Sequence, residues 1–167
     1  MEAASAPRAD PRPVAYLLAP QTPATGNAAT AERLATILEA CGLRVDSHDP
    51  QSLVSFARAR APPDGEGGAA VMVDEAGAAV VIALHGLKSA RLIIGCQAPM
   101  IVVTGGTDVN VDIATDPDLA EAMVRVLRGA TAVVSFSQDM GDAMHRLLAR
   151  SGGGAGRVCL QPPQRGP

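Results

Sequence analysis

The chain has 167 residues, of which 47 % are apolar and only 2 % aromatic, and its formal net charge at pH 7 is −3. This length is enough for one domain with a real core, which must be built from Ala, Val, Leu and Ile. The acidic balance and the scarcity of aromatic rings exclude a typical nucleic-acid surface. No apolar run approaches the ~20 residues of a membrane span.

Apolar runs alternate with helix-like segments along the whole chain, which predicts βαβ crossovers. The expected fold is α/β: a Rossmann-like, mostly parallel sheet with helices on both faces. Residues 1–13 are expected to form a disordered leader, 14–160 one Rossmann-like domain and 161–167 a tail. In chain order we expect a strand at Val14–Ala19, a helix at Ala28–Cys41, a strand at Leu43–Ser47, a helix at Gln51–Arg60, a weak strand at Ala70–Val73, a strand at Val80–Leu84, a helix at Gly86–Cys96, a strand at Met100–Val103, a helix from Asp116-Pro117 to Arg128, a strand at Thr131–Ser135, a helix at Gln138–Arg150 and a strand at Arg157–Leu160.

Cysteine and histidine spacing gives no sign of a metal site. The three histidines are scattered, and the three cysteines form no CxxC pair. We therefore predict reduced, buried thiols, no metal, no cofactor and a cytoplasmic location. The cysteines are Cys41, Cys96 and Cys159.

A functional site is expected where the strands Val80–Leu84 and Met100–Val103 end. His85 follows the first strand directly, and Gly105-Gly106-Thr107-Asp108 follows the second closely. In open α/β sheets, ligands bind outside the carboxyl ends of the strands. His85 could donate to a sugar hydroxyl or move a proton, with Lys88 and Arg91 near the same face by helical spacing. The alternative is a polar strand terminus beside a solvated basic helix face.

The glycine-rich loop Gly105–Asn110 and the junction Thr25–Thr30 could add to that site. Two glycines permit positive φ and close backbone approach, so Asp108 and Asn110 could orient hydroxyls. The alternative for the loop is a structural turn. At Thr25–Thr30, free N–H groups and the macrodipole favour an anion, with Asn27 or Thr30 as further donors. The alternative there is an ordinary capped helix.

One apparent motif fails its structural test. The segment Gly65–Ala70 matches GxGxxA by letter, but it lies in a loop before a strand-like stretch. A dinucleotide fingerprint needs a strand before it and a helix after it. We therefore predict no dinucleotide site there.

Three segments taken together resemble the amino-terminal half of glycosyltransferase family 4 enzymes. They are TGNAATAERL (Thr25–Leu34), ALHGLKSARLI (Ala83–Ile93) and GGTDVN (Gly105–Asn110), and their order and spacing match over about Val14 to Leu160. The resemblance implies the acceptor-side domain of a GT-B fold in an enzyme that retains anomeric configuration and needs no metal. The implied partners are a nucleotide-sugar donor and an unknown acceptor.

The resemblance also assigns roles to residues. Gly26 and Asn27 would line the cleft near the donor diphosphate or the acceptor, and His85 would face the transferred sugar. His85 and Asp108 are the catalytic candidates. The substrate-binding candidates are Gly26, Asn27, Thr30, Lys88, Gly105, Gly106, Thr107 and Asn110.

The chain departs from the family pattern because it stops just after the last strand of the first domain. The donor-binding carboxyl-terminal domain is expected to be absent, so the isolated chain should transfer no sugar. Its uncovered inter-domain face is expected to favour self-association. The alternative function is a non-catalytic binding module on the same scaffold. A nucleotide-sugar epimerase would need further carboxylates and histidines.

Overall fold

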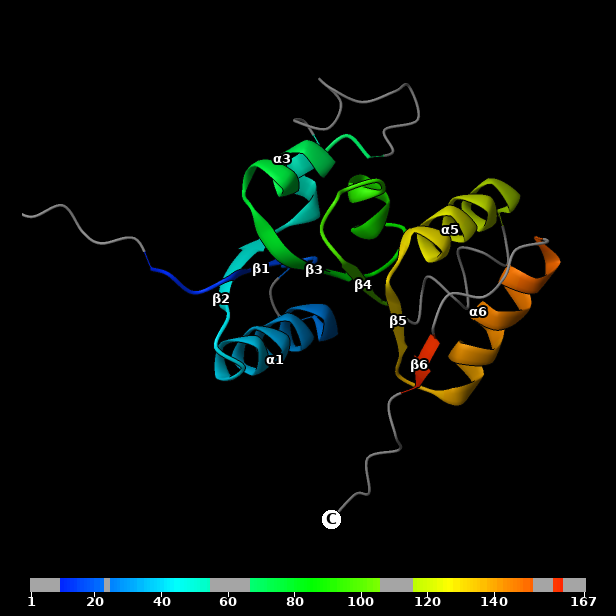
Figure 1. Cartoon of the computed structure of the whole chain (residues 1–167). Helices are drawn as coiled ribbons and strands as arrows, with labels where there is room; N and C mark the ends of the chain where they lie inside the picture. Colours follow the sequence, from blue (N-terminus) through cyan, green and yellow to red (C-terminus); the bar gives the residue numbers. More distant parts are fainter. Residues whose placement is uncertain (1–9, 23–24, 55–66, 106–115, 152–157, 161–167) are drawn as a thin grey trace, which may run out of the picture.

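A six-stranded, all-parallel sheet forms the centre of the computed structural model (Figure 1). The structure describes residues 10–22, 25–54, 67–105, 116–151 and 158–160. The α/β, Rossmann-like prediction is confirmed. The strands are β1 Val14–Leu18, β2 Arg44–His48, β3 Ala78–Leu84, β4 Met100–Val103, β5 Ala132–Ser135 and β6 Val158–Leu160, and the helices are α1 Gly26–Ala40, α3 Ala70–Glu75, the 3₁₀ helix η1 Ala90–Ile93, α5 Pro117–Gly129 and α6 Gln138–Arg150.

The strand order β2-β1-β3-β4-β5-β6 contains one reversal of direction. The chain runs outward from β1 to β2, then crosses back past β1 to β3 and continues to the other edge. The switch point therefore lies between β1 and β3, where Leu18 pairs with Ala83. Crevices at such points are where ligands bind in open α/β sheets.

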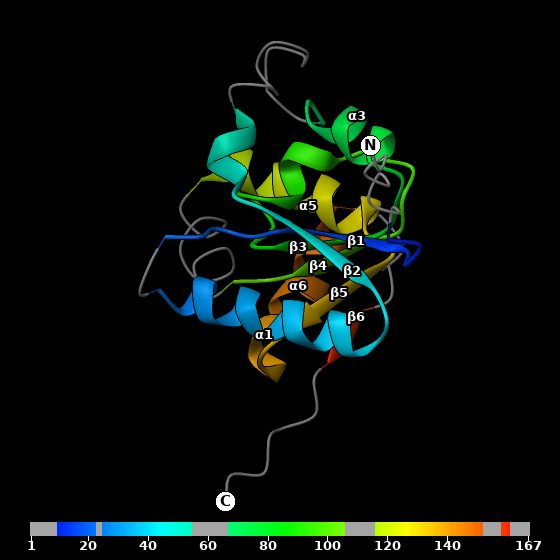
Figure 2. The same ribbon diagram turned by 90° about the vertical axis from the view of Figure 1, so that its left-hand side faces the viewer.

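Helices cover both faces of the sheet because the crossovers are right-handed and run in opposite directions from β1. Helix α1 lies on one face, and α3, η1 and α5 lie on the other (Figures 1 and 2). The strand side chains alternate accordingly. Leu17 of β1 belongs to the core under α1, whereas Tyr16 and Leu18 belong to the larger core under the other helices.

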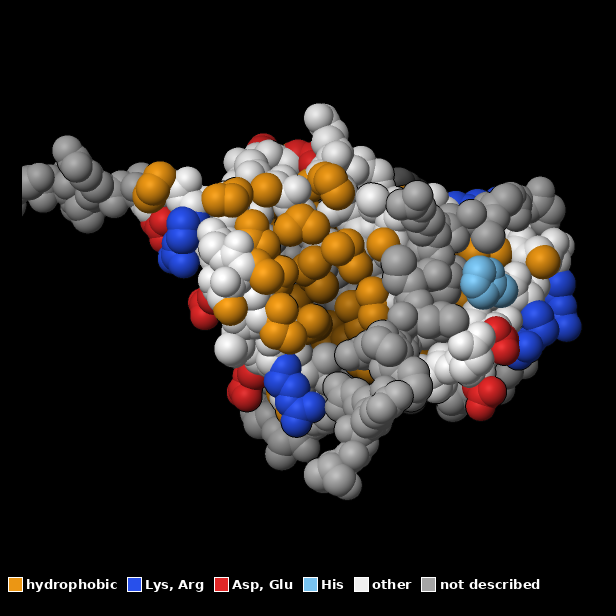
Figure 3. Space-filling view, turned by 60° about the horizontal axis from the view of Figure 1, so that its bottom comes forward, with side chains coloured by type: hydrophobic (Ala, Val, Ile, Leu, Met, Phe, Trp, Pro, Cys, Tyr) orange, Lys and Arg blue, Asp and Glu red, His pale blue; other side chains and the backbone are white. Residues whose placement is uncertain are grey.

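Hydrophobic side chains gather around a hollow on the side of the molecule where α1 lies (Figure 3). Helix α1 accounts for part of this apolar character, since its sequence contains five alanines and Ile37 is 58 % exposed. An apolar patch of this kind favours association. Self-association through an uncovered face remains a prediction.

Two predicted elements between β2 and β4 are wrong. Ala70–Val73, predicted as a weak strand, belongs to helix α3, in which Val73 is fully buried. The prediction failed because a short apolar run does not distinguish a strand from a helix. In the segment predicted as the helix Gly86–Cys96, residues 86–89 form a turn and only Ala90–Ile93 is helical, as a 3₁₀ turn. Of the predicted helix Gln51–Arg60, residues 51–54 are helical and the rest lies outside the described residues.

A close approach of two backbones joins α3 to η1. Gly67 has φ +68°, and its N–H donates to the Arg91 carbonyl at 3.1 Å. A Cβ built at Gly67 would lie 2.7 Å from the Ile94 carbonyl oxygen. The Ala69 N–H adds a bond of 2.9 Å to the Leu92 carbonyl. Glycine is therefore required at position 67 by both conformation and space.

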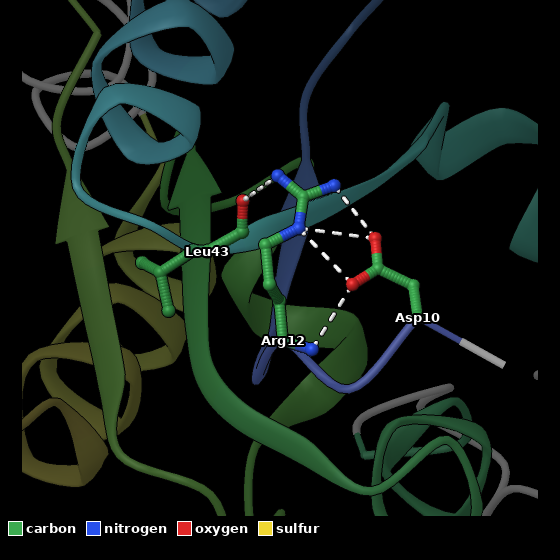
Figure 4. Close-up of polar contacts among 3 residues, drawn as sticks. All are labelled: Asp10, Arg12 and Leu43. Carbon is green, nitrogen blue, oxygen red and sulfur yellow. Dashed lines mark hydrogen bonds and ion pairs between the residues drawn. The ribbon is translucent and has the colours of Figure 1, made fainter.

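At the amino ends of β1 and β2, polar contacts tie the residues before β1 to the loop before β2 (Figure 4). The Arg12 guanidinium bonds both carboxylate oxygens of Asp10, at 2.7 to 3.1 Å, and donates to the Leu43 carbonyl at 3.5 Å. The Arg44 N–H donates to the Pro13 carbonyl at 2.9 Å, which extends the ladder between the two strands. The Arg12 hydrogen bonds lower the pKa of Asp10 from 3.8 to about 2.

Candidate functional site

His85 lies directly after β3, at the switch point of the sheet. Its N–H donates to the Val103 carbonyl at 2.8 Å, which continues the ladder with β4. The chain then leaves the sheet, because His85 has φ +77°. Within the described part of the chain, it is the only residue other than glycine with positive φ. Strained backbone of this kind persists where the surroundings over-determine it, often at functional sites.

The imidazole of His85 is enclosed, with 1 % of the residue exposed. Position 85 thus combines a polar, titratable ring, an uncommon backbone conformation and a place at the switch point. An imidazole there can donate or accept one hydrogen bond with a ligand that reaches it.

The common face of His85, Lys88 and Arg91 stays a prediction. That prediction assumed α-helical spacing, but residues 86–89 form a turn. Lys88 is exposed and Arg91 is half-buried, while His85 is enclosed.

Helix α1 starts at the same edge of the sheet, because it follows β1. Thr25 is its N-cap, accepting from the Ala28 N–H at 3.4 Å, and the first turn carries no acidic side chain. The Thr30 hydroxyl donates to the Gly26 carbonyl at 2.8 Å, so this predicted ligand donor already serves the helix. A Cβ built at Gly26 meets nothing within 4 Å, so packing among the described residues does not require glycine there. Asn27 is half-buried in the first turn.

The glycine-rich loop after β4 is described only at its beginning. Gly105 is buried and follows Thr104 at the end of β4, beside the end of β3. The structure therefore brings Gly105 and His85 to neighbouring strand ends, as expected. The predictions for Gly106, Thr107, Asp108 and Asn110 lie outside the described residues.

Three buried hydroxyl residues near these strand ends were missed from the sequence. Thr104 donates from its hydroxyl to the Val134 carbonyl at 3.2 Å and lies 3.5 Å from the Ser135 hydroxyl oxygen. We assign this pair to the fold, since it joins the ends of β4 and β5. The third, Ser89, is fully buried and bonds to the backbone on both sides of the His85 turn. A polar residue at the end of an apolar run was the available signal for Thr104 and Ser135.

A second polar group lies between β1 and β2. The rings of Tyr16 and His48 are stacked, with centroids 4.4 Å apart and an interplanar angle of 11°. His48 Nε2 lies 2.9 Å from the Asp46 carboxylate. The Tyr16 hydroxyl is buried, and no hydrogen-bond partner for it is present among the described residues. Burial and the Asp46 charge raise the pKa of Tyr16.

The cysteine predictions are partly wrong. Cys41 is exposed at the C-cap of α1, because the helix ends there on its solvent side. Cys96 is half-buried, and burial raises the pKa of its thiol. Cys159 lies in β6, whose side chains are outside the described set.

No family model matches the chain. Within the described residues, no three His, Cys, Asp or Glu side chains come together as a metal site. No helix in the described part of the chain combines the length and apolar character that crossing a bilayer requires.

Proposed function

We propose that this chain is the acceptor-side, amino-terminal domain of a retaining glycosyltransferase of the family 4 type. Its ligands would be a nucleotide-sugar donor and an acceptor whose chemistry the sequence does not define. The observation that supports this most is His85, held at the switch point with φ +77°. A polar ring fixed at a parallel strand end suits recognition of a sugar hydroxyl.

In this proposal different residues bind different parts of the ligand. The imidazole of His85 hydrogen-bonds the transferred sugar, and Asp108 orients a hydroxyl of the same sugar. The amides of the first turn of α1, next to Gly26 and Asn27, face the diphosphate, where the helix dipole favours negative charge. Lys88 adds a positive charge, and the Gly105–Asn110 loop lets the ligand approach the backbone closely.

The alternative function, a non-catalytic binding module, is favoured by one observation. His85 is 1 % exposed, so a sugar reaches its ring only after a local opening. A module that uses another surface needs no such opening. It would therefore leave the His85 ring unchanged by every nucleotide sugar.

The imidazole signals in NMR spectra of the full chain test the proposal. The chain has three histidines, so single substitutions assign all three rings, and His48 and His145 serve as internal controls. We expect UDP-glucose or GDP-mannose to shift the His85 ring and the amides of residues 26–30. Inorganic pyrophosphate should shift the amides alone. If both nucleotide sugars leave His85 and residues 26–30 unchanged, the glycosyltransferase proposal is wrong.

Substitution separates a direct contact from a remote effect. His85→Ala should lower the affinity for the responding nucleotide sugar by up to about tenfold, the loss typical of one hydrogen bond. His145→Ala, on the exposed side of α6, is the matched control and should bind as the wild type does. Equal affinity of both variants would remove His85 from the site.

A further inference from the structure

Ser89 bonds to the backbone on both sides of the turn that carries His85. The Ser89 hydroxyl donates to the carbonyl of Leu84, the last residue of β3. The Ser89 N–H donates to the carbonyl of His85 at 2.9 Å. One residue therefore binds the two carbonyls that enclose the left-handed position.

The hydroxyl of Ser89 is diverted from its ordinary role. Ser89 stands at the N-cap position of η1, where a serine hydroxyl usually accepts from an N–H of the first turn. No such side-chain bond is present at this cap. The hydroxyl turns back to β3 instead, and Ser89 is fully buried, so water does not compete for it.

A left-handed conformation at a residue with a Cβ needs support from its surroundings. At His85 the ladder bond to Val103 fixes the residue's N–H, and Ser89 fixes the carbonyls on both sides. Loss of the Ser89 hydroxyl would free the Leu84 carbonyl and let the turn relax. The direction of the imidazole depends on that turn, because φ at position 85 sets where the Cα–Cβ bond points.

We propose that Ser89 is the positioning residue that fixes His85 for its ligand. Ser89 acts through the backbone of the turn and does not touch the ligand. The inference rests on the proposed function for the role of His85, while the effect of Ser89 on the turn is independent of it.

The test compares the NMR signals of the His85 ring in three full-length variants, Ser89→Ala, Ser89→Thr and Ser135→Ala. Ser89→Ala should move the His85 ring signals in the absence of any ligand and lower the affinity for UDP-glucose by about tenfold, as expected for one hydrogen bond. Ser89→Thr keeps the hydroxyl, so its His85 ring signals and its affinity for UDP-glucose should match those of the wild type. Ser135→Ala removes a hydroxyl of equal burial at the same sheet edge and should leave the His85 signals as in the wild type.

Two outcomes would overturn the proposal: unchanged His85 signals in Ser89→Ala, or equal changes in Ser89→Ala and Ser135→Ala. If Ser89→Ala does not fold, Ser89→Cys keeps the side chain's size with a weaker donor. Its His85 signals should then lie displaced from those of the wild type, and unchanged signals would count against Ser89. A wild type that ignores UDP-glucose would contradict the proposed function, while the ligand-free signals still decide the role of Ser89.

Discussion

Two histidines stand at the carboxyl ends of parallel strands, and the sheet gives them opposite environments. His85 follows the central strand β3, is enclosed and has φ +77°. His48 ends the edge strand β2, keeps 30 % of its side chain exposed, stacks on Tyr16 and contacts Asp46. Residue type and strand position are alike, so the place within the sheet decides which histidine is a candidate for function. Of the two strands that carry these histidines, only β3 ends at the switch point.

The largest expected effect concerns the stacked pair at β2. Tyr16→Ala should destabilise the fold by about 3–5 kcal/mol, because Tyr16 is 2 % exposed within the main core. His48→Ala should cost at most about 1 kcal/mol, since the ring and its Asp46 partner are partly exposed. Urea denaturation measures both. Similar losses for the two variants would mean that the stack, and not burial, carries the stability.

An alanine variant is usually more stable than the glycine variant at the same position. Because the two histidines differ in backbone conformation, we expect this order to be reversed at His85 and kept at His48. At His85, Gly accepts φ +77° without strain, so His85→Gly should be about 1 kcal/mol more stable than His85→Ala. At His48, in an extended strand, His48→Gly should be about 0.5–1 kcal/mol less stable than His48→Ala. Free energies of unfolding for the four variants test this. The same order at both positions would show that position 85 is unstrained in solution.

A smaller effect is expected from removing the Tyr16 hydroxyl. Tyr16→Phe keeps the stack and the buried ring but deletes a buried oxygen that has no hydrogen-bond partner among the described residues. The variant should be as stable as the wild type or up to about 1 kcal/mol more stable. A loss above that size in thermal denaturation would mean that the hydroxyl has a partner in solution, such as a bound water.

The smallest effect concerns the Asp10–Arg12 contact at the amino ends of β1 and β2. The folded pKa of Asp10, about 2, lies below its ordinary value of 3.8, so its stabilising contribution is present above pH 3.8 and is lost as the pH falls toward 2. Both side chains are exposed, so the effect on stability is small. Carboxyl NMR titration should report the low pKa, and Arg12→Ala should return it toward 3.8. An unchanged pKa in that variant would contradict the bidentate contact.

The position of His85 could be predicted from the sequence, whereas its conformation could not. An apolar run followed by a polar residue locates a strand end, and the βαβ pattern locates the parallel edge. The left-handed φ depends on a hydroxyl four residues later that bonds backward to Leu84. Sequence spacing read Gly86–Cys96 as an α-helix because it cannot show that Ser89 is diverted from capping.

The Tyr16–His48 stack was also beyond sequence reasoning. It depends on the register that pairs Leu18 with His48 and Tyr16 with Asp46. Register follows from the fit of whole strands and their loops, and a shift by one residue would place these side chains on opposite faces. The apolar strands themselves were readable because buried parallel strands are nearly continuous apolar runs.

The close backbone contact at Gly67 links a segment distant in sequence to the turn that carries His85. Any side chain there would press on the Ile94 carbonyl, just past η1, and η1 begins one residue after Ser89. Pressure on η1 is thus carried to the residue that holds the His85 turn. A side chain at position 67 would then alter the orientation of the His85 imidazole without contacting it.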